Sequence, residues 1–113
     1  MQHSEAARFE NLLASHLLKL AHWLHDSEGH DIQVYFWRDV QGREVDFIVT
    51  AGKKPWFAVE VKAGNQEMSP HLQYLAARVP VPFMYRVLRQ PGVDVNRGPV
   101  RIISADKFLA ALP

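Results

Sequence analysis

The 113-residue chain carries 13 basic and 12 acidic residues, a net charge of +1, and 48% of its residues are hydrophobic. These proportions are typical of one folded domain and exclude both a disordered chain and one with a strong overall charge. The absence of cysteine excludes a disulfide scaffold, a thiolate nucleophile and a zinc–cysteine site. The sequence shows no membrane span and no signal peptide, so we expect a cytoplasmic protein in which residues 1–113 form a single domain.

The first predicted element is an amphipathic helix that begins after Ser4, its N-cap, and ends near His25. Apolar residues recur along it every three or four positions and predict one buried face: Phe9, Leu12, Leu13, Leu17, Leu20, Trp23 and Leu24. After a turn over residues 26–31, three strands are predicted over 32–37, 44–50 and 56–62. Turns at Gln41-Gly42 and over residues 51–55 separate these strands.

The second half of the chain begins with a short predicted helix over residues 69–78, with Ser69 as its N-cap and Pro70 in its first position. A strand over 81–88, which includes Pro82, a loop over 91–98, a short strand over 100–103 and a terminal helix over 104–112 complete the prediction. Helices before and after three consecutive strands indicate an α+β or mixed α/β fold with a mixed sheet.

Charged residues interrupt two of the predicted strands. Asp46 lies among strongly strand-forming neighbours, and Glu60 and Lys62 share one face of the following strand. Such carboxylates are costly to bury unless they are paired, and hard oxygen ligands suit Mg²⁺. The lysine could orient or deprotonate a water, and Glu10 lies at the edge of the helix face that packs on the sheet. The alternative is a surface ion pair between Glu60 and Lys62, with Glu10 in solvent.

The spacing of these residues resembles the PD-(D/E)XK nuclease signature, with thirteen residues between Asp46 and the Glu60-Val61-Lys62 triplet. More of the chain resembles the uncharacterised C-terminal domain of a prokaryotic AAA-type ATPase family. The matching pieces are residues 8–11 (Arg-Phe-Glu-Asn), 36–38 (Phe-Trp-Arg), 42–48 (Gly-Arg-Glu-Val-Asp-Phe-Ile), 58–62 (Ala-Val-Glu-Val-Lys) and 105–109 (Ala-Asp-Lys-Phe-Leu).

The resemblance implies a restriction-endonuclease-like core made of a helix, three strands, a helix and a strand, with a C-terminal helix. It further implies a Mg²⁺-dependent or Mn²⁺-dependent deoxyribonuclease. Asp46, Glu60 and Glu10 would be the metal ligands, and together with Lys62 they would be the catalytic residues. The chain contains no phosphate-binding loop of the Gly-x-x-x-x-Gly-Lys-Ser/Thr type, so an ATPase domain would be a partner outside it.

Basic residues suggest a DNA contact. Four arginines are candidates for phosphate binding: Arg38, Arg43, Arg86 and Arg89. Residues 78–113 hold six basic and two acidic residues, so metal-independent nucleic-acid binding through this part is one alternative. Another is a non-catalytic interaction or regulatory module that keeps the nuclease fold and docks to an ATPase or forms a homodimer.

Two further residue types have alternative interpretations. His22, His25 and His30 admit a zinc site, but their position near a helix C-terminus favours a simple electrostatic role. The tryptophans could stack on nucleic-acid bases, although Trp23 falls on the apolar stripe of the first helix and is expected in the core.

Overall fold

The computed structural model describes residues 5–64, 67 and 69–112, which form helices and strands in the following order. They are α1 (Glu5–Glu28), β1 (Ile32–Arg38), β2 (Glu44–Ala51), β3 (Lys54–Lys62), α2 (Pro70–Ala76), β4 (Phe83–Leu88), β5 (Asp94–Arg97), β6 (Val100–Ser104) and α3 (Ala105–Ala111). Among these described elements, no helix is long and apolar enough to cross a membrane. The result is a mixed α+β architecture with a mixed sheet, as the sequence predicts.

The sheet has the strand order β1-β2-β3-β4-β6-β5. Strands β1, β2 and β3 form an antiparallel meander, whereas β4 pairs parallel with both β3 and β6. Edge strand β5 is antiparallel to β6. The pairing of β3 with β4 is therefore the seam at which the antiparallel half of the sheet meets the parallel half.

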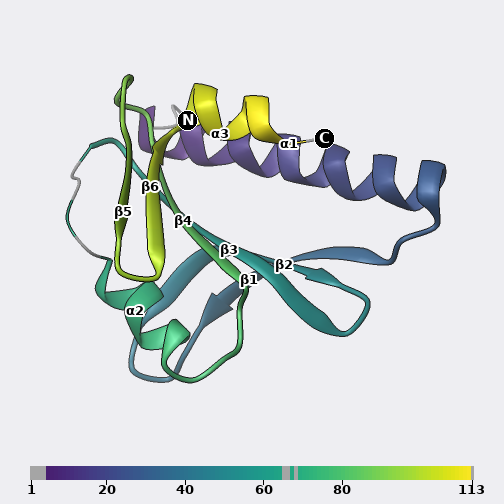
Figure 1. The fold of residues 1–113 in the computed structure, drawn as a ribbon, viewed down its shortest axis with the longest axis horizontal. Helices are drawn as coiled ribbons and strands as arrows, with labels where there is room; N and C mark the ends of the chain where they lie inside the picture. The colour runs from purple at the N-terminus through teal and green to yellow at the C-terminus, as the bar shows by residue number, and fades with distance from the viewer. Residues whose placement is uncertain (1–4, 65–66, 68, 113) are drawn as a thin grey trace.

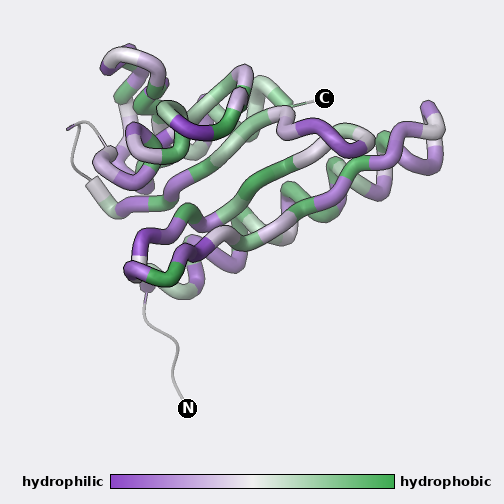
Figure 2. Tube along the Cα trace, turned by 90° about the horizontal axis from the view of Figure 1, so that it is seen from below, coloured by the Kyte–Doolittle hydropathy of each residue, from purple (hydrophilic) through white to green (hydrophobic). Residues whose placement is uncertain are grey.

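The helices cover both faces of this sheet. Helices α1 and α3 lie beside each other on one face, and α2 lies on the other (Figure 1). One buried cluster includes Leu13 and Leu17 of α1 with Phe57 of β3, and the second includes Leu72 of α2 with Ala58 of β3. The middle of the central strands is hydrophobic and the turns that connect them are largely hydrophilic (Figure 2). This separation is the expected signature of a sheet buried on both faces.

Helix α1 is longer than predicted at its C-terminal end. The apolar periodicity stops at Leu24, but the helix continues to Glu28 and ends where Gly29 adopts a positive φ of 71°. The Gly29 N–H donates to the His25 carbonyl and the His30 N–H to the Leu24 carbonyl, a closing pattern that favours glycine. The predicted N-cap, Ser4, lies outside the described residues.

Three other expectations need correction. Residues 94–97, which were predicted as part of a loop, form the short strand β5, because pairing with β6 stabilises a stretch with only one apolar residue. Strand β4 begins at Phe83 rather than at residue 81, since Pro82 has no N–H for a sheet ladder. Leu12 and Trp23, both expected on the buried face of the first helix, are each 50% exposed and are not core residues.

The packing of α1 gives a first prediction that uses two neighbouring leucines. Leu17 is buried against the sheet, whereas Leu18 is half-exposed. We expect Leu17→Ala to lower the free energy of unfolding by about 2–5 kcal/mol, because it removes buried methyl groups and leaves a cavity. Leu18→Ala should cost about 1 kcal/mol or less. Urea unfolding followed by circular dichroism measures both, and equal losses would contradict the assigned helix face.

Candidate functional site

Asp46 lies in an irregularity of strand β2. Two residues of β2, Asp46 and Phe47, stand opposite the single residue Phe36 of β1, because Tyr35 pairs with Ile48 and Trp37 with Val45. This is the residue count of a β-bulge, a feature that redirects a side chain. The Asp46 Oδ2 accepts a 2.7 Å hydrogen bond from the backbone N–H of Val61 on β3. The bulge thus turns the Asp46 carboxylate toward the end of the neighbouring strand.

The electrostatic surroundings of Asp46 disfavour its charged form. The pKa of Asp46 is raised from 3.8 to about 6, mainly by burial and also by the nearby carboxylates of Glu10 and Glu60, against the opposite effects of the Val61 N–H and Lys62. With a pKa near 6, this carboxyl group can bind or release a proton close to neutral pH. The structure therefore brings Asp46, Glu10, Glu60 and Lys62 into one interacting cluster, which comes from α1, β2 and β3.

Glu60 has a different set of partners from those that the sequence suggests. Its side chain is only 4% exposed, and its Oε1 accepts a 2.8 Å hydrogen bond from Nε of Arg86, which is 5% exposed. The hydroxyl of Ser69 donates to the Glu60 Oε2 at 2.9 Å. The two charged residues are register partners across the β3–β4 seam. Glu60 therefore forms a buried ion pair with Arg86, rather than a surface pair with Lys62.

Glu10 and Lys62 lie at a small cavity next to this cluster. The cavity has a volume of about 100 Å³ and is lined by Glu10, Lys62 and Arg89, together with Phe9 and Val61 among its apolar neighbours. Glu10 is half-buried and Lys62 is exposed. Arg89 also pairs with Glu5 of the first turn of α1 at 2.8 Å. Glu10, which can bind a cation, and Lys62, which can bind an anion, therefore line the same cavity.

The donor set can be tested against the metal that the resemblance implies. In the part of the chain that the structure describes, no group of three or more His, Cys, Asp or Glu side chains is arranged to hold a metal ion. Both oxygens of Glu60 are already engaged by Arg86 and Ser69. Mg²⁺ needs only one or two carboxylates when it keeps several waters. Asp46 and Glu10 are the pair whose chemistry fits such a site.

The arginines selected for phosphate contact have separate positions. Arg38 is exposed and pairs with Glu44 at 3.1 Å, and Arg89 is exposed beside the cavity. Arg43 pairs with Asp39 at 2.9 Å and is partly buried. Arg86 lies in the interior, which does not agree with its predicted contact to a phosphate backbone.

The histidines do not converge on one point. His22 and His25 line a pocket together with Asp31, and His30 lies 3.2 Å from the carboxylate of Glu28. Over residues 5–64, 67 and 69–112 they do not form a group that could hold a metal ion. This arrangement does not supply the ligand set of a zinc site.

Comparison with known proteins identifies the family. Residues 6–95 match the family described as Domain of unknown function (DUF4143). The chain belongs to this family. Comparisons with curated proteins and with solved structures gave no match.

Sequence reasoning missed two arrangements in this DUF4143 domain. Arg86 occupies an apolar strand, just as Glu60 does, and a pair of opposite charges on two adjacent buried strands was the available signal. The second arrangement is the stacking of Arg43 and Arg78 on the ring of Tyr74. The i, i+4 spacing of Tyr74 and Arg78 in a predicted helix was an available signal for one contact. No spacing rule links Arg43 to them, because the β1–β2 hairpin meets α2 only in the folded chain.

The buried ion pair of the DUF4143 domain generates a second prediction. Arg86→Met should lower the free energy of unfolding by about 3–5 kcal/mol, because Glu60 then remains buried without a cation. Adding Glu60→Leu to the same chain should recover most of this loss, since no buried charge is left. Urea unfolding of the two single variants, the double variant and the wild type measures the coupling. As a control, Arg101→Met removes the exposed pair with Asp94 and should have a much smaller effect.

The pKa of Asp46 predicts a pH-dependent stability. Because this pKa is about 6 in the folded state and 3.8 in the reference state, the folded protein holds the proton more tightly between these values. Stability should fall as the pH rises from about 4 to 6 and should then level off. Asp46→Asn keeps an acceptor for the Val61 N–H but has no charge, so we expect it to be more stable than the wild type above pH 6.

Thermal unfolding in metal-free buffer at several pH values tests this expectation. The difference between the Asp46→Asn variant and the wild type should vanish below pH 4 and reach on the order of 1 kcal/mol at pH 7, because solvent screens a partly exposed carboxylate. Parallel curves for the two proteins from pH 4 to 7 would contradict the raised pKa.

Proposed function

We propose that this DUF4143 domain is a PD-(D/E)XK nuclease-like domain. In this proposal it cleaves DNA phosphodiester bonds with the help of Mg²⁺ or Mn²⁺, and it works beside an AAA-type ATPase domain. Asp46, Glu10 and Lys62 form the reactive centre, and Glu60 stabilises it from the sheet interior.

The observation that carries the proposal is the position of Asp46 among other ionisable groups. Two carboxylates, Glu10 of α1 and Glu60 of β3, are close enough to influence the protonation of Asp46, and Lys62 acts on it from the end of β3. A structural role alone does not require two carboxylates that disfavour the charge of Asp46. A bound divalent cation would offset the repulsion between these negative charges. Carboxyl groups with strongly shifted pKa values cluster at functional sites.

The order of the elements also supports the proposal. A helix, an antiparallel meander of three strands, a second helix and a fourth strand parallel to the third follow one another from α1 to β4. This order agrees with the helix, three strands, helix and strand that we expect of a restriction-endonuclease-like core, and so supports the proposal. In it, Asp46 lies on the second strand and the Glu60-Val61-Lys62 triplet at the end of the third.

Each residue has a defined role in the proposed reaction. Asp46 and Glu10 would hold the cation, which would stabilise the negative charge on the phosphoryl oxygens and activate a water. Lys62 is exposed at the cavity mouth and can orient that water or take its proton. Arg89 lines the same cavity and can contact a phosphate oxygen of the substrate. Arg86 positions Glu60 and does not touch the substrate.

A second candidate is a non-catalytic interaction or regulatory module that docks to an ATPase or forms a homodimer. The observation that favours it is the internal neutralisation of Glu60 by Arg86 and Ser69. The surface also carries large exposed apolar side chains, including Phe36 at 58% and Phe83 at 53%. Such side chains are common at protein–protein contacts when they gather in a patch.

Titration with Mn²⁺, followed by the electron paramagnetic resonance of the free ion, tests the proposal and separates the two candidates. We expect one saturable site in the wild type, and we expect Asp46→Asn or Glu10→Gln to weaken it by about tenfold or more. Glu60→Gln should weaken Mn²⁺ binding less, because Glu60 pairs with Arg86 and is not a ligand of the proposed metal site. Asp94→Asn, which changes a carboxylate at the far edge of the sheet, is the matched control and should bind as the wild type does.

The outcomes decide between the candidates. Absence of saturable binding at millimolar Mn²⁺, or binding that survives Asp46→Asn, would contradict the metal site and favour the interaction module. Where binding follows the expected pattern, Mg²⁺-dependent cleavage of single-stranded and duplex DNA is measured next, with the Asp46→Asn variant as the inactive reference.

A further inference from the structure

Tyr74 of α2 lies between two guanidinium groups. The Cζ atom of Arg43 is 3.9 Å from the centre of the Tyr74 ring, and the Cζ atom of Arg78 is 3.6 Å from it. Two planar cations at these distances cannot share one face of a ring without overlapping, so they occupy opposite faces. The three side chains form a stack in which the β1–β2 hairpin and the end of α2 meet.

The two arginines of this stack differ in what neutralises them. Arg43 donates to the carboxylate of Asp39 at 2.9 Å and also to the side chain of Gln41. Arg78 is exposed and donates to the Tyr74 carbonyl at 3.3 Å. Among the described residues, no carboxylate lies within ion-pair distance of Arg78. Its charge is therefore available to an anion from solution.

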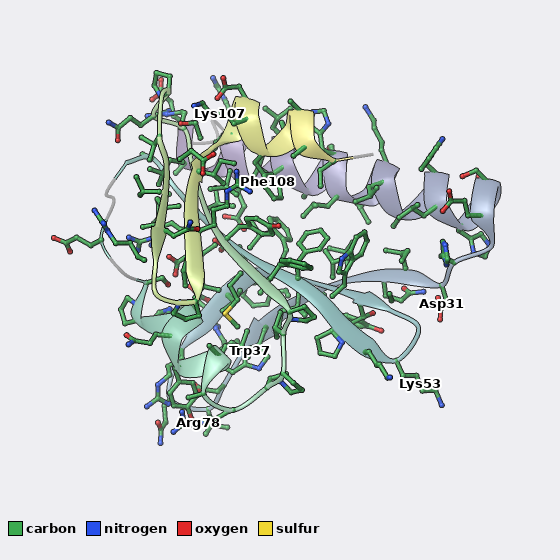
Figure 3. All side chains as sticks on the ribbon, viewed as in Figure 1. Asp31, Trp37, Lys53, Arg78, Lys107 and Phe108 are labelled. Carbon is green, nitrogen blue, oxygen red and sulfur yellow. The ribbon has the colours of Figure 1, made fainter. Side chains whose placement is uncertain are left out.

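A second aromatic ring lies next to the stack. The Trp37 and Tyr74 ring centres are 6.4 Å apart, with planes inclined by 34°. Trp37 and Arg78 lie at the same lower end of the molecule in Figure 3. Both aromatic rings are half-buried, so each keeps part of its surface in solvent. We call Trp37, Arg43, Tyr74 and Arg78 the Tyr74 platform.

We propose that the Tyr74 platform binds single-stranded nucleic acid, with a base stacked on the Arg78 guanidinium and the adjoining phosphate held by its charge. Flat faces of aromatic rings and guanidinium groups accept any unpaired base, and one free cation satisfies one backbone phosphate. The contact with the Tyr74 ring restrains the Arg78 side chain, so less side-chain freedom is lost when a base is bound.

The charge of the platform favours a single strand over a duplex or an acidic protein. Asp39 neutralises Arg43, and Glu44 neutralises the neighbouring Arg38, so Arg78 is the main free charge. Duplex binding at physiological salt needs many phosphate contacts, which this surface does not offer. An acidic peptide would use the charge of Arg78 but offers no nucleobase to stack on it. A strand with exposed bases uses both the charge and the planes.

The platform lies close to the proposed centre along the chain. Arg43 immediately precedes β2, and Asp46 is the third residue of that strand. The inference rests on the proposed function for its biological meaning, since Arg43 of the platform adjoins the strand that carries Asp46. Binding to the platform itself requires no metal, and the two proposals can fail separately.

Fluorescence anisotropy of a labelled twelve-residue oligothymidylate, titrated with the full chain in buffer that contains EDTA, tests the inference. We expect Arg78→Gln and Tyr74→Leu to weaken binding about tenfold, whereas Tyr74→Phe, which keeps the ring, should bind as the wild type does. Arg78→Gln should also lower the slope of log affinity against log salt by about 0.7, the share of one phosphate on a single strand. Lys53→Gln removes a cation at the turn between β2 and β3 and is the control.

Each outcome supports or overturns the inference. Thermal unfolding shows whether the variants are folded. If Tyr74→Leu does not fold, the Arg78→Gln variant still tests the inference. Undetectable binding by the wild type, or equal binding by the Arg78→Gln and Lys53→Gln variants, would overturn the platform. Displacement by oligoglutamate as effective as displacement by unlabelled oligothymidylate would show that only charge is recognised, which would overturn the stacking role. Loss of Mn²⁺ binding in the separate titration would leave this result unchanged.

Discussion

The buried ion pair between Glu60 and Arg86 joins the two halves of the sheet. It crosses the seam where the antiparallel meander ends and the parallel strands begin, and the Ser69 hydroxyl attaches the start of α2 to the same carboxylate. Two charges in the interior are costly unless each finds its partner with good geometry. The pair therefore favours one alignment of β3 and β4, since a shifted register would leave both charges buried and unpaired.

Asp46 and Glu60, the two carboxylates on strands β2 and β3, lie close together but have different partners. Glu60 is supplied with a cation and a hydroxyl, so its negative charge is stabilised in the interior. Asp46 is partly buried, receives one backbone N–H and has the carboxylates of Glu10 and Glu60 nearby, so its charge is disfavoured. The stable carboxylate suits a structural role, and the unstable one suits the binding of something that enters from solution. The local partners, and not the residue type, make this distinction.

Much of the fold could be predicted from local patterns. The apolar periodicity from Phe9 to Leu24 predicts the long helix, and the β-branched and aromatic runs predict the first three strands. Strand β5 could not be predicted because its pairing with β6 stabilises it, and Asp94 reaches Arg101 only in the folded hairpin. Trp23 has the right spacing for the core, but α3 covers only part of it.

The candidate site shows the same limit. The position of charged residues within apolar strands was enough to select Asp46, Glu60 and Lys62, and helix periodicity was enough to add Glu10. Whether a selected carboxylate is free or paired depends on the neighbouring strand, which for Glu60 is β4, 26 residues away in sequence. A sequence pattern could identify the charged positions, but it could not assign Arg86 to the interior.

Ser69 has a consequence for the way the molecule opens. Its hydroxyl oxygen accepts the N–H of Leu72 at 3.1 Å while its O–H donates to Glu60, so one atom caps α2 and contacts the seam. Helix α2 cannot unwind from its first turn without loosening the ion pair, and the seam cannot part without uncapping the helix. These segments should form one cooperative unit, whose amide hydrogens exchange with solvent together, whereas the β5 edge can open alone.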